Sequence, residues 1–398
     1  MAPLSASSAA KRIAASAKLD SPPCRSRPQA PAFDARDARA QNGAEAADIV
    51  RSRNGTVARG QTRSSALPPR FARLVAAAAL ALCASAAARA DDDAAACLWR
   101  PPAPERLARA DAVADYRSTL QACHAADGRE RIAIRSMSVG AEPLLLVADP
   151  DKLTTRIERA ACWSCADTDE ASRASTRMMR AIAESAEAPG LVRRGFLRNA
   201  GLVHGDAPGA FVTGDLCPSL KPLERGFLEK LAAQGPHTPV ALSISGLWLN
   251  HHFADYRWLL DQQVSGALDI LWVNHTYHHP YARGAPDEHN FLLEPGVDAD
   301  AEILQLERLL VANGQTPSLF FRFPGLISSA PLMQAVRRHH LISLGADAWL
   351  ALDQRPSAGS IVLVHANGNE PLGIKLFERD LARDSLPRPF EPLTAAPD

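Results

Sequence analysis

The chain has 398 residues, and its 44 basic and 44 acidic side chains give a formal net charge of zero. With 46% hydrophobic and 6% aromatic residues it can build a buried core, which excludes a collagen-like or largely disordered chain. Residues 1–90 carry 14 basic and 5 acidic side chains, so 91–398 has 30 basic against 39 acidic ones and is acidic. An acidic body argues against nucleic acid as the main partner, because phosphate binding needs a surplus of positive charge.

The first ninety residues have the composition of a leader. Residues 1–68 are rich in Ala, Ser, Arg and Pro without a sustained apolar period, and we expect them to be disordered. Residues 69–90 combine a basic start, an apolar run over 74–84 and an A-x-A pattern that ends at Ala90. This arrangement is typical of a signal peptide, and the apolar run is shorter than the about 20 residues of a membrane span.

A signal peptide normally begins close to the first residue, whereas this one begins near Leu67. We therefore interpret Met1 as a mis-assigned start and expect a mature protein of residues 91–398. It would be periplasmic or secreted, with no stable membrane span once the signal is removed. The alternative is a disordered basic leader with an apolar anchor.

Five cysteines follow the predicted cleavage point, which is an odd number. In an oxidising compartment four of them could form two disulfides, and the sequence does not choose among the three pairings. A C-x-x-C pair at Cys162 and Cys165 favours structural disulfides over a redox centre, because no strand precedes it. Cys217 is the odd cysteine. The five are Cys97, Cys123, Cys162, Cys165 and Cys217.

The mature chain divides into two predicted parts. Residues 91–205 form an N-terminal cap region with strand-like runs, and 206–385 form a domain in which strands and helices alternate. Alternation of this length implies an α/β fold with parallel strands and right-handed crossovers. The predicted strands of the second part are 210–213, 240–245, 268–273, 318–321, 341–344 and 360–364. Its predicted helices are 223–231, 256–264, 298–311 and 331–338, of which 298–311 is the clearest.

Polar residues stand at or just past the carboxyl ends of these predicted strands. In parallel α/β folds that edge of the sheet holds the active site, so residues far apart in sequence should meet there. The five residues concerned are Asp215, His275, Arg322, Asp347 and His365.

Each of these residues also has an ordinary structural interpretation. His275 and His279 form an H-x-x-x-H pair suited to Zn²⁺, although most histidine clusters are loop or surface residues. Asp215 could cap a helix, His365 could be a satisfied core histidine, and Arg322 could form a buried ion pair with Asp215. Their order along the chain is therefore more informative than any one of them.

In order, the motifs are Thr213-Gly214-Asp215, His275 to His279, Arg322-Phe323-Pro324-Gly325, Asp347-Ala348-Trp349 and Leu363-Val364-His365. This series resembles the five motifs of the polysaccharide deacetylase family (carbohydrate esterase family four) over about residues 206–380. The resemblance implies a distorted (β/α) barrel of about seven parallel strands. It also implies an acetylated glycan as substrate.

The resemblance implies a divalent metal, expected to be zinc, held by His275 and His279 together with Asp215. The metal would polarise the acetamide carbonyl and activate a water molecule. Asp215 would be the general base, and Arg322 would keep it ionised and oriented. His365 would be the general acid that protonates the leaving amine.

Three further roles follow from the same resemblance. Asp347 would raise the pKa of His365 and keep it protonated. Trp349 would form the wall of the pocket for the acetate methyl group. Pro324 and Gly325 would contact the substrate, Gly325 standing where the family usually has a tyrosine.

One departure from the family divides the functional interpretation. Leu216 stands where the family has its usual aspartate metal ligand, and leucine cannot bind a metal. Asp215 could take that role, Asn274, Asp287 or another residue could replace it, or no metal binds. The two hypotheses are an exported metal-dependent N-deacetylase and a catalytically degenerate relative that binds glycan without turnover.

Overall fold

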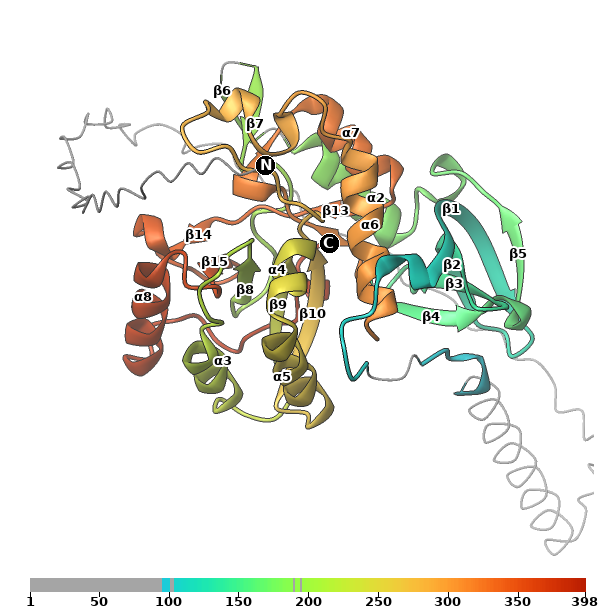
Figure 1. The fold of residues 1–398 in the computed structure, drawn as a ribbon, viewed down its shortest axis with the longest axis horizontal. Coiled ribbons are helices and arrows are strands. Elements are labelled where there is room, and N and C mark those ends of the chain that lie inside the picture. The colour runs from blue at the N-terminus through green and yellow to red at the C-terminus, as the bar shows by residue number, and fades with distance from the viewer. Residues whose placement is uncertain (1–94, 101–103, 189, 194) are drawn as a thin grey trace, which may run out of the picture. The chain divides into compact units, whose positions relative to one another are not determined.

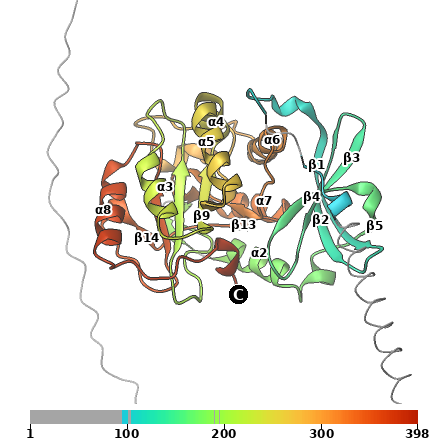
Figure 2. The same ribbon diagram turned by 90° about the horizontal axis from the view of Figure 1, so that it is seen from below.

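The computed structural model shows two large β-sheets and a smaller one, packed with helices (Figures 1 and 2). The predicted leader and signal peptide lie outside the described residues. Each helix in the described part of the chain is too short or too polar to cross a bilayer. The described residues are 95–100, 104–188, 190–193 and 195–398.

A seven-stranded sheet forms the centre of the second part of the chain, and every neighbouring pair of its strands is parallel. The sheet curls into a half-barrel, which confirms the expected distorted (β/α) barrel. In sheet order the strands are β13 (Ile342–Ser343), β11 (Phe320–Phe321), β10 (Leu268–Asn274), β9 (Thr238–Ile244), β8 (Phe211–Leu216), β15 (Ile361–His365) and β14 (Ala348–Trp349).

The central strands are buried on both faces, which is why they read as nearly continuous apolar runs. Successive side chains point to opposite faces of a strand. On β8, Val212 and Leu216 belong to the cluster that packs against helix α3, while Phe211 belongs to a second cluster. Thr213 and Asp215 share the parity of Phe211, so Asp215 faces the side opposite to Leu216.

Helices connect and cover these strands. Helix α6 corresponds to the predicted helix 298–311, and the Asp298 side chain caps its amino end by accepting a hydrogen bond from the backbone N–H of Ala301. In Figures 1 and 2, α6 lies between the parallel sheet and the N-terminal sheet. The α-helices are α2 (Arg177–Glu187), α3 (Arg225–Ala232), α4 (Gly246–His251), α5 (Phe253–Val264), α6 (Ala299–Ala312), α7 (Ala330–Arg338) and α8 (Pro371–Ala382).

Short 3₁₀ helices occupy several of the connections. They are η1 (Ala110–Ala112), η2 (Ala160–Cys162), η3 (Ala171–Arg173), η4 (Asp287–His289), η5 (Phe291–Leu293), η6 (Pro324–Leu326), η7 (Leu350–Leu352) and η8 (Leu393–Ala395).

The N-terminal region forms an antiparallel sheet of five strands in the order β4-β3-β2-β1-β5. Two disulfides brace it, Cys97 to Cys162 and Cys123 to Cys165, so each cysteine of the C-x-x-C pair bonds to a distant partner. Among the described residues, Cys217 is the free cysteine. The strands are β1 (Val113–Ala125), β2 (Glu130–Val139), β3 (Glu142–Ala148), β4 (Thr155–Arg159) and β5 (Trp163–Asp167).

A buried ion pair joins this sheet to the barrel. Arg135 on β2 and Glu307 on α6 are both fully buried, with 2.6 Å between Nε and Oε2 and 3.0 Å between Nη2 and Oε1. The Tyr116 hydroxyl donates to Glu307 Oε2 at 2.8 Å. Asn274, the residue before His275, donates to Glu307 Oε1 at 3.4 Å. The N-terminal sheet therefore contacts the chain next to the first candidate ligand.

The smallest strands differ most from the predictions. The predicted strand 341–344 is reduced to β13, and β14 lies where no strand was predicted. A third sheet orders β12 (Ile327–Ser328), β7 (Phe196–Arg198) and β6 (Leu191–Arg193). Strand β7 precedes the predicted domain boundary at 205/206, and its partner β12 follows it.

Candidate active site

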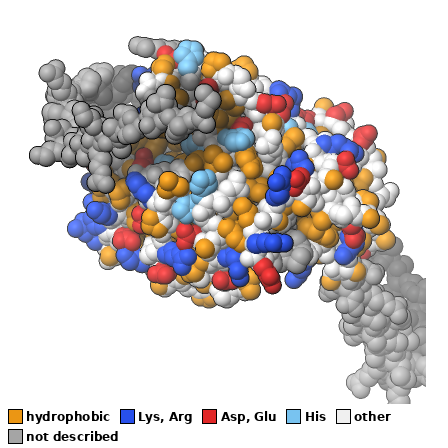
Figure 3. Space-filling view, viewed as in Figure 1, with side chains coloured by type: hydrophobic (Ala, Val, Ile, Leu, Met, Phe, Trp, Pro, Cys, Tyr) orange, Lys and Arg blue, Asp and Glu red, His pale blue; other side chains and the backbone are white. Residues whose placement is uncertain are grey.

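A cavity of about 740 Å³ opens at the carboxyl edge of the parallel sheet. Its wall includes side chains that follow the ends of several strands, and histidine side chains are visible among hydrophobic ones on the face shown in Figure 3. The lining residues that matter for chemistry are Cys217, His279, Gly325, Trp349, His365 and Glu370. Residues far apart in sequence, from Cys217 to Glu370, thus line one cavity.

Three buried side chains offer donor atoms to a common point. A ligand atom from each of Cys217, His275 and His279 lies within 4.8 Å of the other two. Cys217 Sγ is 3.5 Å from His275 Nε2, and the two imidazole rings have centroids 4.8 Å apart. Thiolate and imidazole are the donors that zinc prefers, so the group has the chemistry of a zinc site.

The orientation of both imidazoles is compatible with metal binding. His275 Nδ1 lies 2.8 Å from the carbonyl oxygen of Arg322, so with the proton on Nδ1 the ring leaves Nε2 free to face Cys217. His279 Nε2 is buried and has no hydrogen-bond partner among the described residues. A buried ring nitrogen without a partner is costly in an empty core, and a cation would satisfy it. The residues present therefore fit a divalent metal.

The loop that carries the two histidines is held by its own polar groups. The Asn274 side chain accepts a hydrogen bond from the Thr276 backbone N–H at 3.0 Å and donates to the Ile303 carbonyl at 3.0 Å. Thr276 has a φ of 68°, a left-handed conformation that a threonine adopts rarely. The Thr276 hydroxyl in turn accepts from the His279 backbone N–H at 3.1 Å. The turn is thereby fixed with both rings on one side.

Asp215 and Arg322 form a buried ion pair beside this group. Arg322 Nη1 donates to Asp215 Oδ1 at 2.8 Å and to the Thr213 hydroxyl at 2.8 Å. Burial alone would raise the pKa of Asp215, but the Arg322 guanidinium, with His275 and His365, outweighs it and lowers that pKa to about 2. The second oxygen, Oδ2, lies 3.8 Å from His275 Nε2. Asp215 is therefore an ionised base next to the candidate metal position.

Cys217 and His365 affect each other's charge. Burial would raise the pKa of the Cys217 thiol, but positive charge on His279 and His365 lowers it well below its usual value. Burial would lower the pKa of His365, but the Cys217 sulfur, Glu370 and Asp215 raise it well above its usual value. The site thus favours a thiolate and a protonated imidazole at neutral pH.

Glu370, a residue that we did not predict, is the acid next to His365. Its Oε2 lies 2.8 Å from His365 Nδ1, although the angles there are not those of a good hydrogen bond, so the contact is an ion pair. The same oxygen accepts a hydrogen bond from Trp349 Nε1 at 2.8 Å. The Trp349 ring centroid is 5.8 Å from that of His365. Trp349 lines the same cavity, and its indole N–H also holds Glu370.

Asp347 lies at the other end of the sheet, which corrects the expectation that it faces His365. Its carboxylate accepts from the Ile361 backbone N–H at 2.9 Å and from the Ser360 hydroxyl at 3.1 Å, and Oδ2 is 2.7 Å from His204 Nδ1. Ile361 is the first residue of β15 and His365 is the last. The reason for the difference is β14, the short strand that was not predicted. Asp347 precedes its first residue, and the carboxyl edge is reached only at Trp349.

Gly325 shapes the floor of the cavity. Its φ is 61°, and a Cβ atom there would lie 2.5 Å from the Phe291 ring. A larger residue at this position would therefore not fit without moving Phe291. Pro324 before it is buried, so of the two predicted substrate contacts only Gly325 lines the cavity.

The alternative ligands considered from the sequence are engaged elsewhere. The Asn274 side chain accepts from the Thr276 backbone N–H and donates to the Ile303 carbonyl on helix α6, and Asp287 pairs with Arg198. Leu216 is buried in the helix-facing core. Cys217 was set aside only as an unpaired cysteine, yet strand alternation from Asp215 across Leu216 would have placed it on the Asp215 side. No comparable pattern in the sequence indicates Glu370.

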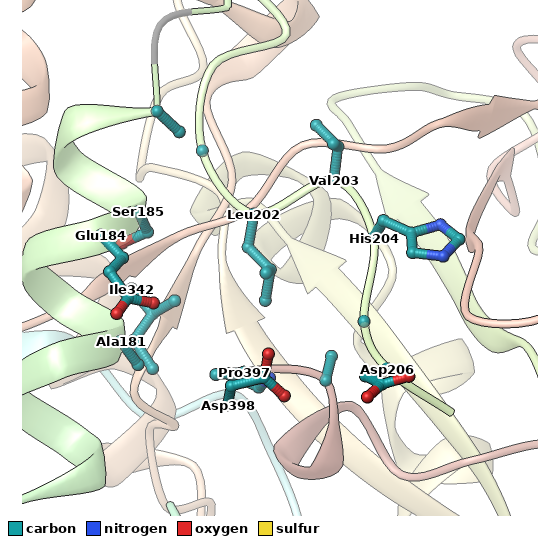
Figure 4. A pocket seen from close by; sticks show the side chains of 14 residues that line it. Ala181, Glu184, Ser185, Leu202, Val203, His204, Asp206, Ile342, Pro397 and Asp398 are labelled. Atoms are coloured by element: carbon teal, nitrogen blue, oxygen red, sulfur yellow. The ribbon is translucent and has the colours of Figure 1, made fainter. Parts of the chain in front are cut away.

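A second cavity, of about 410 Å³, lies away from this site (Figure 4). Leu202 points toward Pro397 and Asp398, whereas the His204 ring points away from them. The lining includes the carboxylates of Glu184, Asp206 and Asp398 but none of the candidate catalytic residues.

No protein-family model matches the chain. Among solved structures, it is similar to a family 4 carbohydrate esterase from Bacillus anthracis (19% identity, 49% of this chain and 86% of that chain, TM-score 0.36). It is also similar to a chitin deacetylase from the fungus Colletotrichum lindemuthianum (14%, 48% and 88%, 0.34) and to a family 4 pseudoenzyme from Bacillus anthracis (13%, 46% and 63%, 0.32). At these TM-scores we draw neither the fold nor the function from the similarity.

Proposed function

We propose that this protein is an exported, metal-dependent hydrolase that removes N-acetyl groups from a glycan. One observation carries the proposal. A carboxylate and three histidines come from three different strand ends, in the chain order that resembles polysaccharide deacetylases. His279 and His365 line one cavity, and the buried Asp215 and His275 lie beside them.

A divalent metal at the His275 and His279 imidazoles would supply Lewis-acid activation of the amide carbonyl and of water. The buried Nε2 of His279 without a partner and the fixed Nδ1 of His275 support its binding. Zinc fits this group best, because the two imidazoles offer nitrogen and the neighbouring Cys217 offers sulfur, and none of the three offers oxygen.

Asp215 is the general base of the proposed reaction. Arg322 holds one of its oxygens and leaves Oδ2 facing the candidate metal position. Because its pKa is about 2, the carboxylate is ionised throughout the neutral range and can accept a proton from water.

His365 is the general acid. It lines the cavity together with Cys217 and His279, and its raised pKa keeps it protonated at neutral pH. It can therefore deliver a proton to the leaving amine when the amide bond breaks. Trp349, whose ring is tilted against that of His365, limits the pocket for the acetyl group.

Export is supported by two observations. The N-terminal sheet holds two disulfides, which persist in oxidising compartments. The leader composition is that of a signal peptide. An extracellular or periplasmic glycan is the substrate class that such a location offers.

Leu216 in place of the usual carboxylate ligand favours the second candidate, a degenerate glycan-binding protein without metal. Metal analysis of the purified protein together with acetate release from chitooligosaccharides separates the two. We expect bound metal and released acetate. A metal-free protein that releases no acetate from any acetylated glycan, yet still binds one, would leave only the second candidate.

A further inference from the structure

We propose that Cys217 is a thiolate ligand of the metal, in a Cys-His-His set that replaces the carboxylate-His-His set implied by the motif resemblance. The inference rests on the metal that the proposed function requires, but not on the identity of the substrate. Three observations support it: the distance of the sulfur from the two histidines, the His279 ring nitrogen that has no partner among the described residues, and the ion pair that already holds Asp215.

The sulfur is close to where a tetrahedral ligand must be. Ligands at about 2.0–2.3 Å from one Zn²⁺ lie roughly 3.5 Å from each other. Cys217 Sγ lies 3.5 Å from His275 Nε2, and the largest separation in the group is 4.8 Å. Only small movements are therefore needed to bring all three donors onto one ion. The open fourth position is what a catalytic zinc site keeps for water or substrate.

The histidines point to an ion independently of the cysteine. His279 is 8% exposed, and its Nε2 has no partner in the described part of the chain. His275 Nδ1 contacts the Arg322 carbonyl, the outer contact that typically fixes a metal-binding imidazole. Both unused nitrogens belong to the group that contains Cys217 Sγ.

The chain offers no better carboxylate ligand at position 215 or 216. Leu216 occupies the position of the usual ligand and faces the helices. Asp215 is committed through Oδ1 to Arg322, which would weaken it as a ligand and suits it to act as a base. The chain has moved the third ligand by one residue, from position 216 to 217, and strand alternation brings that side chain back to the Asp215 side.

A thiolate changes which metals the site accepts. Soft sulfur favours Zn²⁺, Co²⁺ and Cd²⁺ over Mg²⁺, Mn²⁺ and Ca²⁺, which prefer oxygen. We therefore expect Cd²⁺ to compete effectively with Zn²⁺ and Mg²⁺ not to compete.

Cobalt spectroscopy tests the assignment without relying on activity. The metal-free full chain is titrated with Co²⁺. We expect an intense near-ultraviolet absorption from thiolate-to-cobalt charge transfer together with visible bands of a tetrahedral ion. The Cys24→Ser/Cys83→Ser variant changes the two cysteines outside the described residues and should keep both features.

Substitution of Cys217 should remove the charge-transfer band. Cys217→Ser should lose the band and lower the affinity for Zn²⁺ by more than the roughly 10–100-fold that loss of an outer contact costs. Cys217→Asp should bind Co²⁺ without the band, because it restores a carboxylate ligand. Circular dichroism checks that both variants fold.

Alkylation of the unaltered protein gives a measurement that needs no variant. Iodoacetamide should modify Cys217 in the metal-free protein, and Zn²⁺ should protect it, as seen by peptide mass analysis. Co²⁺ binding without a charge-transfer band, unchanged affinity in Cys217→Ser, or no protection by Zn²⁺ would each overturn the assignment. Absence of acetate release with the band present would instead contradict only the proposed function.

Discussion

The two ends of strand β15 each place an imidazole beside a carboxylate, but in different surroundings. At the carboxyl end, His365 and Glu370 line a cavity, and no well-aligned hydrogen bond fixes the ring nitrogen in the described structure. At the amino end, Asp347 accepts from two neighbouring groups of the chain in addition to contacting His204. Satisfied polar groups hold a fold in place, whereas buried groups left without partners are available for a ligand.

This comparison also explains why a sequence motif can mislead. Asp347 and Trp349 are only two residues apart, but Asp347 precedes the first residue of β14 and Trp349 is its last residue. Only Trp349 reaches the cavity. The acid that meets His365 comes instead from the start of helix α8.

The comparison predicts its largest effect at His365. His365→Ala removes the proposed proton donor, so kcat for acetate release should fall by roughly 10²–10⁴-fold. Metal content should be unchanged, since His365 is outside the proposed ligand set. The matched control, His204→Ala at the other end of β15, should leave turnover near that of the unaltered protein. An equal fall of kcat in both variants would contradict the proposal that only the carboxyl end of β15 is catalytic.

Breaking the buried ion pair of the site should destabilise the fold. Arg322→Met leaves the Asp215 carboxylate buried without its partner, and the free energy of unfolding should fall by about 3–5 kcal/mol. Urea denaturation measures this loss. The double variant Arg322→Met/Asp215→Asn should recover part of it, because the uncompensated charge is gone.

The ion pair of Asp215 and Arg322 should also make the free energy of unfolding depend on pH in the acid range. The folded-state pKa of Asp215 is about 2, below its usual value of 3.8. The stabilisation is therefore present above about pH 4 and is lost as the pH falls toward 2, an effect on the order of 2 kcal/mol. Asp215→Asn should have a shallower loss of stability over that interval. An unchanged acid profile would show that the pair contributes little.

Glu370 gives a smaller prediction, at the carboxyl end. Glu370→Gln keeps the size of the side chain but removes the charge beside His365, so kcat should fall about 10-fold. KM and metal content should change little. Glu370→Asp should retain part of the activity. If Glu370→Gln lowers the thermal stability and kcat per folded molecule stays unchanged, Glu370 only supports the structure.

Asp347 gives the smallest and opposite prediction. Asp347→Asn weakens its contacts at the amino end, and the free energy of unfolding should fall by about 1–2 kcal/mol. Acetate release per folded molecule should not change. Thermal unfolding and steady-state rates together test this. A large loss of kcat without a loss of stability would return Asp347 to the active site.

The regular elements of the fold could be predicted from the sequence. The run over 268–273 lies within β10, and 298–311 corresponds to α6, because long apolar runs and helical periodicity are strong signals. Strands of two residues, such as β14, have no pattern to recognise. Their existence depends on pairing with β15, which is a tertiary effect.

The candidate site was predictable to the same extent. Residues at or just past the ends of clearly patterned strands, such as Asp215, His275 and His365, are brought together because the pattern shows where each strand ends. Cys217 directly follows β8, so strand alternation indicates its side, whereas Glu370 lies in the connection between β15 and α8, where the backbone path decides what a side chain meets. A sequence pattern does not specify that path.

Arg135 has a consequence for any attempt to isolate a minimal catalytic unit. A fragment that begins at residue 206 would lack this guanidinium beside Glu307, and it would uncover apolar side chains of the barrel that share a buried cluster with the N-terminal sheet. Such a fragment should aggregate or fail to accumulate, whereas one that retains β2 should not. The amino-terminal sheet is in this sense a folding partner of the barrel that is encoded in the same polypeptide.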